Sequence, residues 1–159
     1  DTATTEIYTL SLHDALPIST EPRYLARDFL SVLKEKLVLR KEAVLLYPEQ
    51  EMWFNYRKPR PPKGGAYFFA AKLNVPIISC FVEIVDTQED DTPEFRQVKY
   101  VLHVLDVLYP DPAKSVRENT EMLSERDYAL KKDCYETAYG KKLTYAFEDT
   151  DIAGWKEAL

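Results

Sequence analysis

The sequence predicts an α/β domain in which helices cover a mixed β-sheet. Two stretches carry apolar residues at the three- and four-residue spacing of an amphipathic helix. Between them lie short apolar runs rich in β-branched residues, which are typical of strands. Glycine, proline and aspartate mark the junctions, and the order strand, helix, strand, strand, helix indicates this fold class.

The first predicted elements are a helix and a buried strand. Residues 24–40 have apolar side chains at positions 25, 29, 30, 33 and 37, and charged residues cover the other face. Residues 43–47 form a short continuous apolar run that ends at Pro48, which predicts a buried parallel strand. Glu49 would then follow the carboxyl end of a strand, where open α/β sheets place their ligand crevices.

The middle of the chain predicts a short helix and two strands. Gly64-Gly65 opens the sequence AYFFAAKL, which should form a helix packed by rings and alanines. Residues 75–84 are mostly apolar and β-rich, with Pro76 near the start, where a strand tolerates proline. The acidic stretch 87–93 should be an exposed turn, and residues 97–109 should form a second strand.

A long helix is predicted next, with Asp111 as its N-cap and Pro112 in its first turn. It should end at Gly140, a residue type that favours the position after a helix. Its apolar face would hold the following residues: Val116, Leu123, Leu130, Cys134 and Ala138. Residues 143–159 are polar and are expected to form a partly ordered tail.

Composition limits the class of protein. An apolar content of 45% and a charged content of 30% are ordinary for a soluble domain, and a formal charge of −6 argues against nucleic-acid binding. The two cysteines, Cys80 and Cys134, have no metal or redox spacing, so we expect both to be small core residues in a reduced, cytosolic compartment. No apolar run approaches the ~20 residues that span a bilayer.

Residues 1–18, DTATTEIYTLSLHDALPI, resemble the in-frame translation of a common short-read sequencing-library adapter. We therefore expect them to be an artefact without function, including the adjacent His13 and Asp14, and we exclude them from fold reasoning. The expected organisation is an artefact over 1–18, a domain portion over 19–142 and the polar tail over 143–159.

Three short motifs occur in order between Tyr47 and Ile78. They are Tyr47-Pro48-Glu49, Lys63-Gly64-Gly65-Ala66 and Val75-Pro76-Ile77-Ile78. This order resembles the glycerolipid and lysophospholipid acyltransferase family (PlsC-like, of the 1-acylglycerol-3-phosphate acyltransferase type). The resemblance implies the C-terminal portion of a glycerol-phosphate acyltransferase-like fold whose N-terminal part is missing.

The resemblance implies a substrate-binding set made of Glu49, Arg57, Arg60, Lys63 and Gly65. In the family the first motif reads Phe-Pro-Glu-Gly-Thr-Arg, and its glutamate and arginine engage the glycerol-phosphate acceptor. Here Met52 stands in place of that arginine. The basic residues that follow, Lys58 among them, could supply the missing charge, since guanidinium and ammonium groups bind phosphate. The alternative is a solvated basic loop stiffened by prolines.

The implied activity is transfer of a fatty acyl group from acyl-CoA or acyl-carrier protein to a lysophospholipid or glycerol-phosphate hydroxyl, in phospholipid biosynthesis at the cytoplasmic face of a membrane. The family's catalytic pair is His-x-x-x-x-Asp, with histidine as general base. Leu108 lies five residues after His103 and Ile18 lies five after His13, so no such pair is present. We therefore expect a peripheral, membrane-associated fragment without catalytic residues, metal or cofactor, and His103 as a half-buried structural residue.

Two other hypotheses remain open. Loop 52–63 joins aromatic and basic residues, a composition typical of membrane-interface patches, so the chain could be a non-catalytic module that binds anionic lipid. Pro59 and Pro62 also form a PxxP pattern, which is typical of ligands of SH3-type modules.

Overall fold

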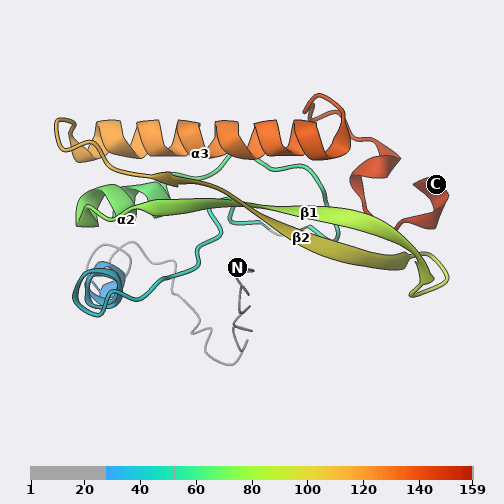
Figure 1. Ribbon diagram of the computed structural model, residues 1–159, viewed down its shortest axis with the longest axis horizontal. Helices are drawn as coiled ribbons and strands as arrows, with labels where there is room; N and C mark the ends of the chain where they lie inside the picture. Colours follow the sequence, from blue (N-terminus) through green and yellow to red (C-terminus); the bar gives the residue numbers. More distant parts are fainter. Residues whose placement is uncertain (1–27, 52, 159) are drawn as a thin grey trace, which may run out of the picture.

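The computed structural model describes residues 28–51 and 53–158 (Figure 1). Helices pack on a two-stranded antiparallel sheet, in agreement with a broad α/β class. The elements are α1 (Leu30–Leu33), η3 (Lys34–Leu39), α2 (Gly65–Leu73), β1 (Ile77–Asp90), β2 (Arg96–Leu108), α3 (Val116–Tyr139), η4 (Asp149–Asp151) and η5 (Lys156–Ala158).

The two strands form a long hairpin. Ile77 pairs with Leu108 at one end and Asp90 with Arg96 at the other, and the register shifts twice, between Ser79 and Cys80 and between Asp86 and Asp90. Such bulges increase the local twist. Both strands were predicted, and β2 begins within one residue of the expected start, but β1 runs on into the acidic stretch, so the exposed turn begins only after Asp90.

The predicted parallel strand over residues 43–47 is wrong. This segment has no strand partner in the described residues, and four of its five side chains are exposed. Because a strand needs hydrogen bonds to a neighbour, an apolar run alone cannot form one. The sheet of the described residues is therefore antiparallel rather than mixed, and Glu49 does not follow a strand.

The first helix begins within the predicted range, and residues 24–27 lie outside the described residues. α1 continues directly into η3, which is wound as a π-helix and ends at Leu39. Leu33, the last residue of α1, is buried, with 1% of its surface exposed. Phe29 packs edge-on against Phe69 of α2, with 5.2 Å between the ring centroids, and so fixes this helix beside α2.

α3 was predicted, but its N-cap is Ser115 rather than Asp111. The Ser115 hydroxyl accepts a hydrogen bond from Glu118 N–H, and the Glu118 carboxylate accepts one from Ser115 N–H. This reciprocal capping box satisfies two backbone donors. Asp111 instead accepts a bond from the backbone of Ala113, which makes a turn before the helix. Gly140 ends α3 in the left-handed conformation at φ 64°, as predicted.

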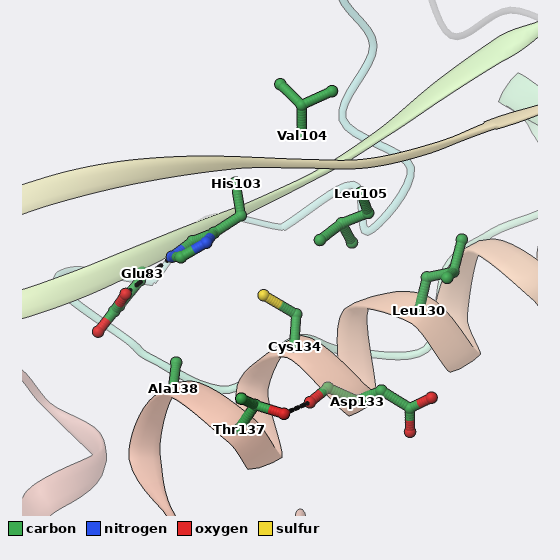
Figure 2. Close-up of a pocket in the computed structure, with 9 residues that line it drawn as sticks. All are labelled: Glu83, His103, Val104, Leu105, Leu130, Asp133, Cys134, Thr137 and Ala138. Carbon is green, nitrogen blue, oxygen red and sulfur yellow. Dashed lines mark hydrogen bonds and ion pairs between the residues drawn. The ribbon is translucent and has the colours of Figure 1, made fainter.

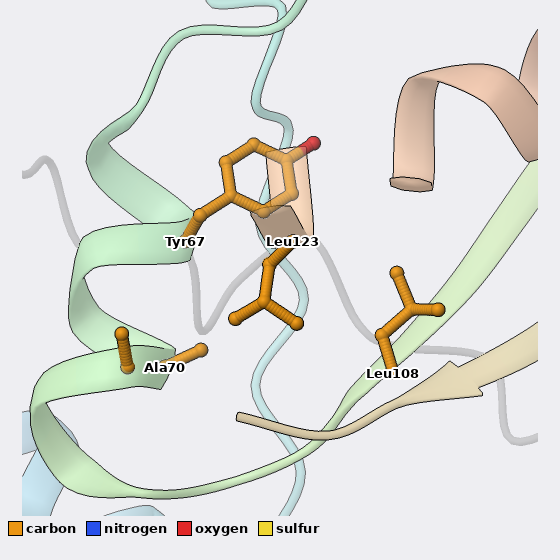
Figure 3. Packing of buried hydrophobic residues seen from close by; sticks show 5 residues of the cluster. Tyr67, Ala70, Leu108 and Leu123 are labelled. Carbon is orange, nitrogen blue, oxygen red and sulfur yellow. The ribbon is translucent and has the colours of Figure 1, made fainter. Parts of the chain in front are cut away.

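The core lies where α2, α3 and the open end of the hairpin meet (Figure 3). Tyr67 and Ala70 of α2 face Leu123 of α3 and Leu108 of β2. Tyr67, Leu108 and Leu123 are each 1% exposed. The predicted apolar face of α3 is confirmed in part, because Val116 and Leu130 also pack on this cluster.

Residues 143–158, expected as a partly ordered polar tail, are docked onto the rest of the protein. Ile152 pairs with Tyr56, and Trp155 pairs with Phe95 beside the hairpin turn. Asp151 and Ala153 are completely buried. This segment thus joins the loop before α2 to the far end of the hairpin, at the right of Figure 1.

Candidate functional site

The Pro-Glu turn and the start of α2 are held together by the backbone. Lys63 N–H donates to the carbonyl of Pro48 over 2.7 Å. Gln50 N–H closes the turn on the carbonyl of Tyr47 over 3.2 Å, with Gln50 at a positive φ of 60°. Two of the three motifs that suggested the acyltransferase resemblance are therefore neighbours in space.

The first turn of α2 has no side-chain cap. Its N–H groups lie at the positive end of a helix dipole and have no intrahelical acceptor, the situation that favours an anion. A Cβ built at Gly65 meets nothing within 4 Å, so packing does not require glycine at this position.

Lys63 is the cation beside this helix end. Lys63 is an exposed residue, and its ammonium group forms no ion pair with residues 28–51 and 53–158. An unpaired ammonium group next to free N–H groups can hold a phosphate without first breaking an internal contact.

Glu49 is half-buried close to Arg60. The Arg60 Nε atom lies 3.6 Å from Glu49 Oε2. Burial raises the pKa of the Glu49 carboxyl, and Arg60 and Lys131 act in the opposite direction. A partly desolvated carboxyl of this kind can hydrogen-bond a hydroxyl group of a ligand.

The positive charge of Arg60 is largely balanced by groups of the protein itself. Its guanidinium donates to both the side chain and the backbone carbonyl of Glu51. It also lies over the ring of Trp53, 4.8 Å from the centroid. Arg60 is therefore a residue that positions Glu49 and Trp53, with little charge left for a ligand.

Arg57 and Lys58 point away from this site and serve the structure. Arg57 donates to Asp86 of β1 over 2.5 Å and to the Thr150 carbonyl over 2.8 Å. Lys58 lies 2.6 Å from Asp151, and both side chains are almost completely buried. Of the five predicted binding residues, the structure brings together Glu49, Arg60, Lys63 and Gly65, whereas Arg57 lies against the hairpin.

A buried polar network next to this site escaped the sequence analysis. Tyr67 of α2 donates to Asp127 of α3 over 2.5 Å, and Lys131 lies 2.9 Å from the same carboxylate. Burial, then the bond to Asp127, raises the pKa of the Tyr67 hydroxyl above its usual range. The four-residue spacing of Asp127 and Lys131 could have indicated this pair, but nothing local points to Tyr67.

The PxxP pattern is not accessible in this fold. Pro59 is buried, and its carbonyl accepts a hydrogen bond of 2.9 Å from the Tyr145 hydroxyl. SH3-type modules bind proline-rich ligands as exposed, extended segments. The hypothesis that the Pro59–Pro62 pattern is such a ligand is therefore wrong for this conformation.

A concave region of 410 Å³ lies between the hairpin and α3 (Figure 2). His103 Nε2 lies 2.8 Å from Glu83 Oε2, and Cys134 extends from α3 toward the strands. The His103 side chain is 34% exposed, as expected of a half-buried residue. Burial, then the charge of Glu83, raises the pKa of the Cys134 thiol, which disfavours the thiolate that a nucleophile needs.

In the described part of the chain, no group of three metal-binding side chains comes together. None of the described helices is both long and apolar enough to cross a bilayer.

Comparison with known proteins gives no match to a family model, to a curated protein or to a solved structure. The geometry of the described residues is therefore the basis on which a function can be argued.

Proposed function

We propose that this chain carries the acceptor-binding side of a glycerolipid acyltransferase. The observation that supports it is the hydrogen bond from Lys63 N–H to the Pro48 carbonyl, which brings the Pro-Glu turn to the Lys-Gly start of α2. The phosphate of a lysophospholipid or glycerol phosphate would bind Lys63 and the first N–H groups of α2. Glu49 would accept a hydrogen bond from a glycerol hydroxyl.

In the enzyme of which this chain would be a part, a histidine would take the proton of the acceptor hydroxyl, whose oxygen attacks the thioester carbonyl of acyl-CoA or acyl-carrier protein. The C–S bond then breaks, and the departing thiolate takes up the proton from the histidine to leave as a thiol. The contribution of this chain is to hold the acceptor in place, which accelerates such a reaction through positioning. His103 is paired with Glu83 in a different part of the structure, so it is not the base of this proposal.

The binding step is tested with lysophosphatidic acid and glycerol 3-phosphate by titration calorimetry. Lys63→Met should weaken binding of both by about tenfold, the order of magnitude of one charge-assisted phosphate contact. Lys72→Met is the matched control, because Lys72 is an exposed lysine at the opposite end of α2. Equal losses in both variants, or no binding by the unaltered chain, would overturn the proposal.

Gly65→Ala separates binding from folding. Because a Cβ meets nothing there, alanine should leave the melting temperature unchanged or raise it. If an anion approaches the backbone at this glycine, the same substitution should still weaken phosphate binding. Unchanged affinity would remove Gly65 from the site.

The proposal that this chain belongs to an acyltransferase is tested by DNA sequencing. Sequencing the source DNA ahead of Ser19 should reveal an in-frame His-x-x-x-x-Asp motif. Native sequence without that motif would count against the enzyme and leave only the binding function.

A second function, peripheral membrane contact, is favoured by the exposure of two rings. Trp53 is 53% exposed and Phe54 is 64% exposed. Since Arg57, Lys58 and Arg60 are paired within the protein, this contact would depend on ring insertion more than on charge. In vesicle sedimentation, Trp53→Ala should then reduce binding, and added salt should change the binding little. A strong salt dependence would instead favour the hypothesis that the basic residues of loop 52–63 bind anionic lipid.

A further inference from the structure

One face of the hairpin is covered by α3, and none of the helices among residues 28–51 and 53–158 covers the middle of the opposite face. Phe81 and His103 are cross-strand partners, and His103 lines the region that α3 covers. Side chains alternate between the two faces of a strand, so the residues next to Phe81 and His103 point away from α3. The register shift between Ser79 and Cys80, where Leu105 has no cross-strand partner, reverses this alternation before Val107. We define the outer hairpin face by these cross-strand pairs: Ile78–Val107, Cys80–Val104 and Val82–Leu102.

The outer hairpin face is apolar and exposed. Leu102 and Val104 of β2 are 63% and 67% exposed, and Ile78 and Val82 of β1 are 60% and 45% exposed. At its end Tyr100 is 60% exposed, and its hydroxyl donates to Asn55. These exposed side chains lie side by side in one apolar surface, whereas monomers rarely leave more than a few hundred Å² of contiguous apolar surface open, and each partner buries roughly 800 Å² in a standard dimer.

The face has no charge of either sign among its three cross-strand pairs. A second copy can therefore pack on it without placing like charges in contact, although the chain carries a net charge of −6. A membrane surface fits less well, because the face has no lysine or arginine to attract anionic headgroups.

The hairpin edges are partly closed, which directs association to the face. On β1, the backbone N–H of Ile84 donates to the Tyr139 hydroxyl over 2.8 Å, and this hydroxyl donates to the Ile84 carbonyl over 3.2 Å. On β2, Arg96 N–H donates to the Gly154 carbonyl over 2.7 Å. Occupied edge groups cannot extend the sheet to another chain.

We propose that the outer hairpin face packs against the same face of a second copy in a two-fold symmetric dimer. The two hairpins would stack as layers about 10 Å apart, as packed sheets do. Each copy contributes the same surface, so the interface is closed and does not propagate.

The oligomeric state of the full chain is the test, measured by sedimentation velocity over a range of micromolar concentrations. We expect a concentration-dependent dimer. Leu102→Lys and Val104→Lys each place like charges on both sides of the interface and should weaken the dimer by at least about tenfold. Phe147→Lys is the control, since Phe147 is 63% exposed but lies in the C-terminal segment, and it should leave the dimer intact.

Circular dichroism verifies that each variant is folded. If a lysine variant fails to fold, cross-linking gives a second test. Val104→Cys, in a background of Cys134→Ser and of Cys80→Ala, which keeps the face apolar, should give a cross-linked dimer with a short bismaleimide. A monomer at every concentration, equal dissociation of the Phe147→Lys control, or growth into species larger than a dimer would each overturn the proposal.

Discussion

Lys58 and Asp151 form the most deeply buried ion pair of the described residues, with side chains that are 1% and 0% exposed. Lys58 also donates to the Ala146 carbonyl over 2.8 Å, and Asp151 accepts a bond from Glu148 N–H over 2.8 Å. Buried charges need such additional partners, because both are removed from water. The loop that was predicted to hold a phosphate thus uses this lysine to bind its own C-terminal segment.

Lys58→Met should reduce the free energy of unfolding by about 3 kcal/mol, because it leaves the buried Asp151 carboxylate with only the longer contact of 3.5 Å to Lys141. Urea unfolding measures this change. The double variant Lys58→Met with Asp151→Leu removes both charges and should be less destabilised than the sum of the two single variants. Additive losses would mean that the two charges do not stabilise one another.

Glu49 should make stability depend on pH. Burial raises its pKa above the ordinary 4.5, so the folded protein binds this proton more tightly than the unfolded chain does. The free energy of unfolding should therefore fall as pH rises from 4.5 through the folded pKa, and then stay level. Glu49→Gln lacks this titrating group. As pH rises through the same window, the melting temperature of this variant should therefore increase relative to that of the unaltered protein.

Thermal melts from below pH 4.5 to neutrality provide the comparison. The charges that act on the Glu49 carboxyl are those of Arg60 and Lys131, so the curve of the Lys72→Met variant should run parallel to that of the unaltered protein. A pH-independent difference for Glu49→Gln would contradict a half-buried carboxyl at this position.

At the level of residues, the sequence predicted in part which side chains lie near one another, while their role in binding stays a prediction. Glu49, Lys63 and Gly65 were identified from short motifs, and their proximity depends on one backbone hydrogen bond near those motifs. Arg57 and Lys58 could not be separated from Arg60, because their partners Asp86 and Asp151 lie far away in the sequence. Local composition reports a charge but does not report its distant partner.

Among the elements, α3 shows how a cap decides where a helix begins. Asp111 and Ser115 are both favourable N-cap residues, but Ser115 alone has Glu118 three residues later. Sequence periodicity predicted the helix and its Gly140 end, whereas the start was misplaced by ignoring the capping box. Residues 43–47 failed for another reason: strand formation requires a partner, which a local apolar run does not reveal.

Ser115→Ala should lower the free energy of unfolding by about 1 kcal/mol, since it removes the oxygen that accepts from Glu118 N–H. Chemical denaturation measures the change. Ser124→Ala, in the interior of the same helix, should be neutral or stabilising because alanine favours helix interiors. Equal destabilisation by both would show that the cap does not contribute.

For the whole molecule, the C-terminal segment (residues 143–158) connects the loop before α2 to the turn of the hairpin through backbone hydrogen bonds. Ala153 N–H donates to the Asn55 carbonyl, and Lys156 N–H donates to the Glu94 carbonyl. Between them Gly154 adopts a φ of 77°, where a Cβ would lie 2.6 Å from the Arg96 carbonyl oxygen. The chain can pass this close to β2 only because the residue is glycine.

Gly154→Ala should therefore displace the segment and destabilise the protein by more than about 1 kcal/mol, through both the contact and the backbone strain. Amide hydrogen exchange at Arg96 should accelerate, because its N–H loses the Gly154 acceptor. Gly65→Ala is the internal control, as its site is open. Unchanged exchange at Arg96 would mean that the segment tolerates the added methyl group.

The Lys58–Asp151 pair also has a consequence in time. The two residues are separated by 93 positions, and translation adds about 5–20 residues per second, so Lys58 is incorporated into the chain roughly 5–20 seconds before its partner. During that interval the lysine has no reason to leave water. The loop that contains it should remain open on the nascent chain, and burial of Lys58 should be among the last steps of folding.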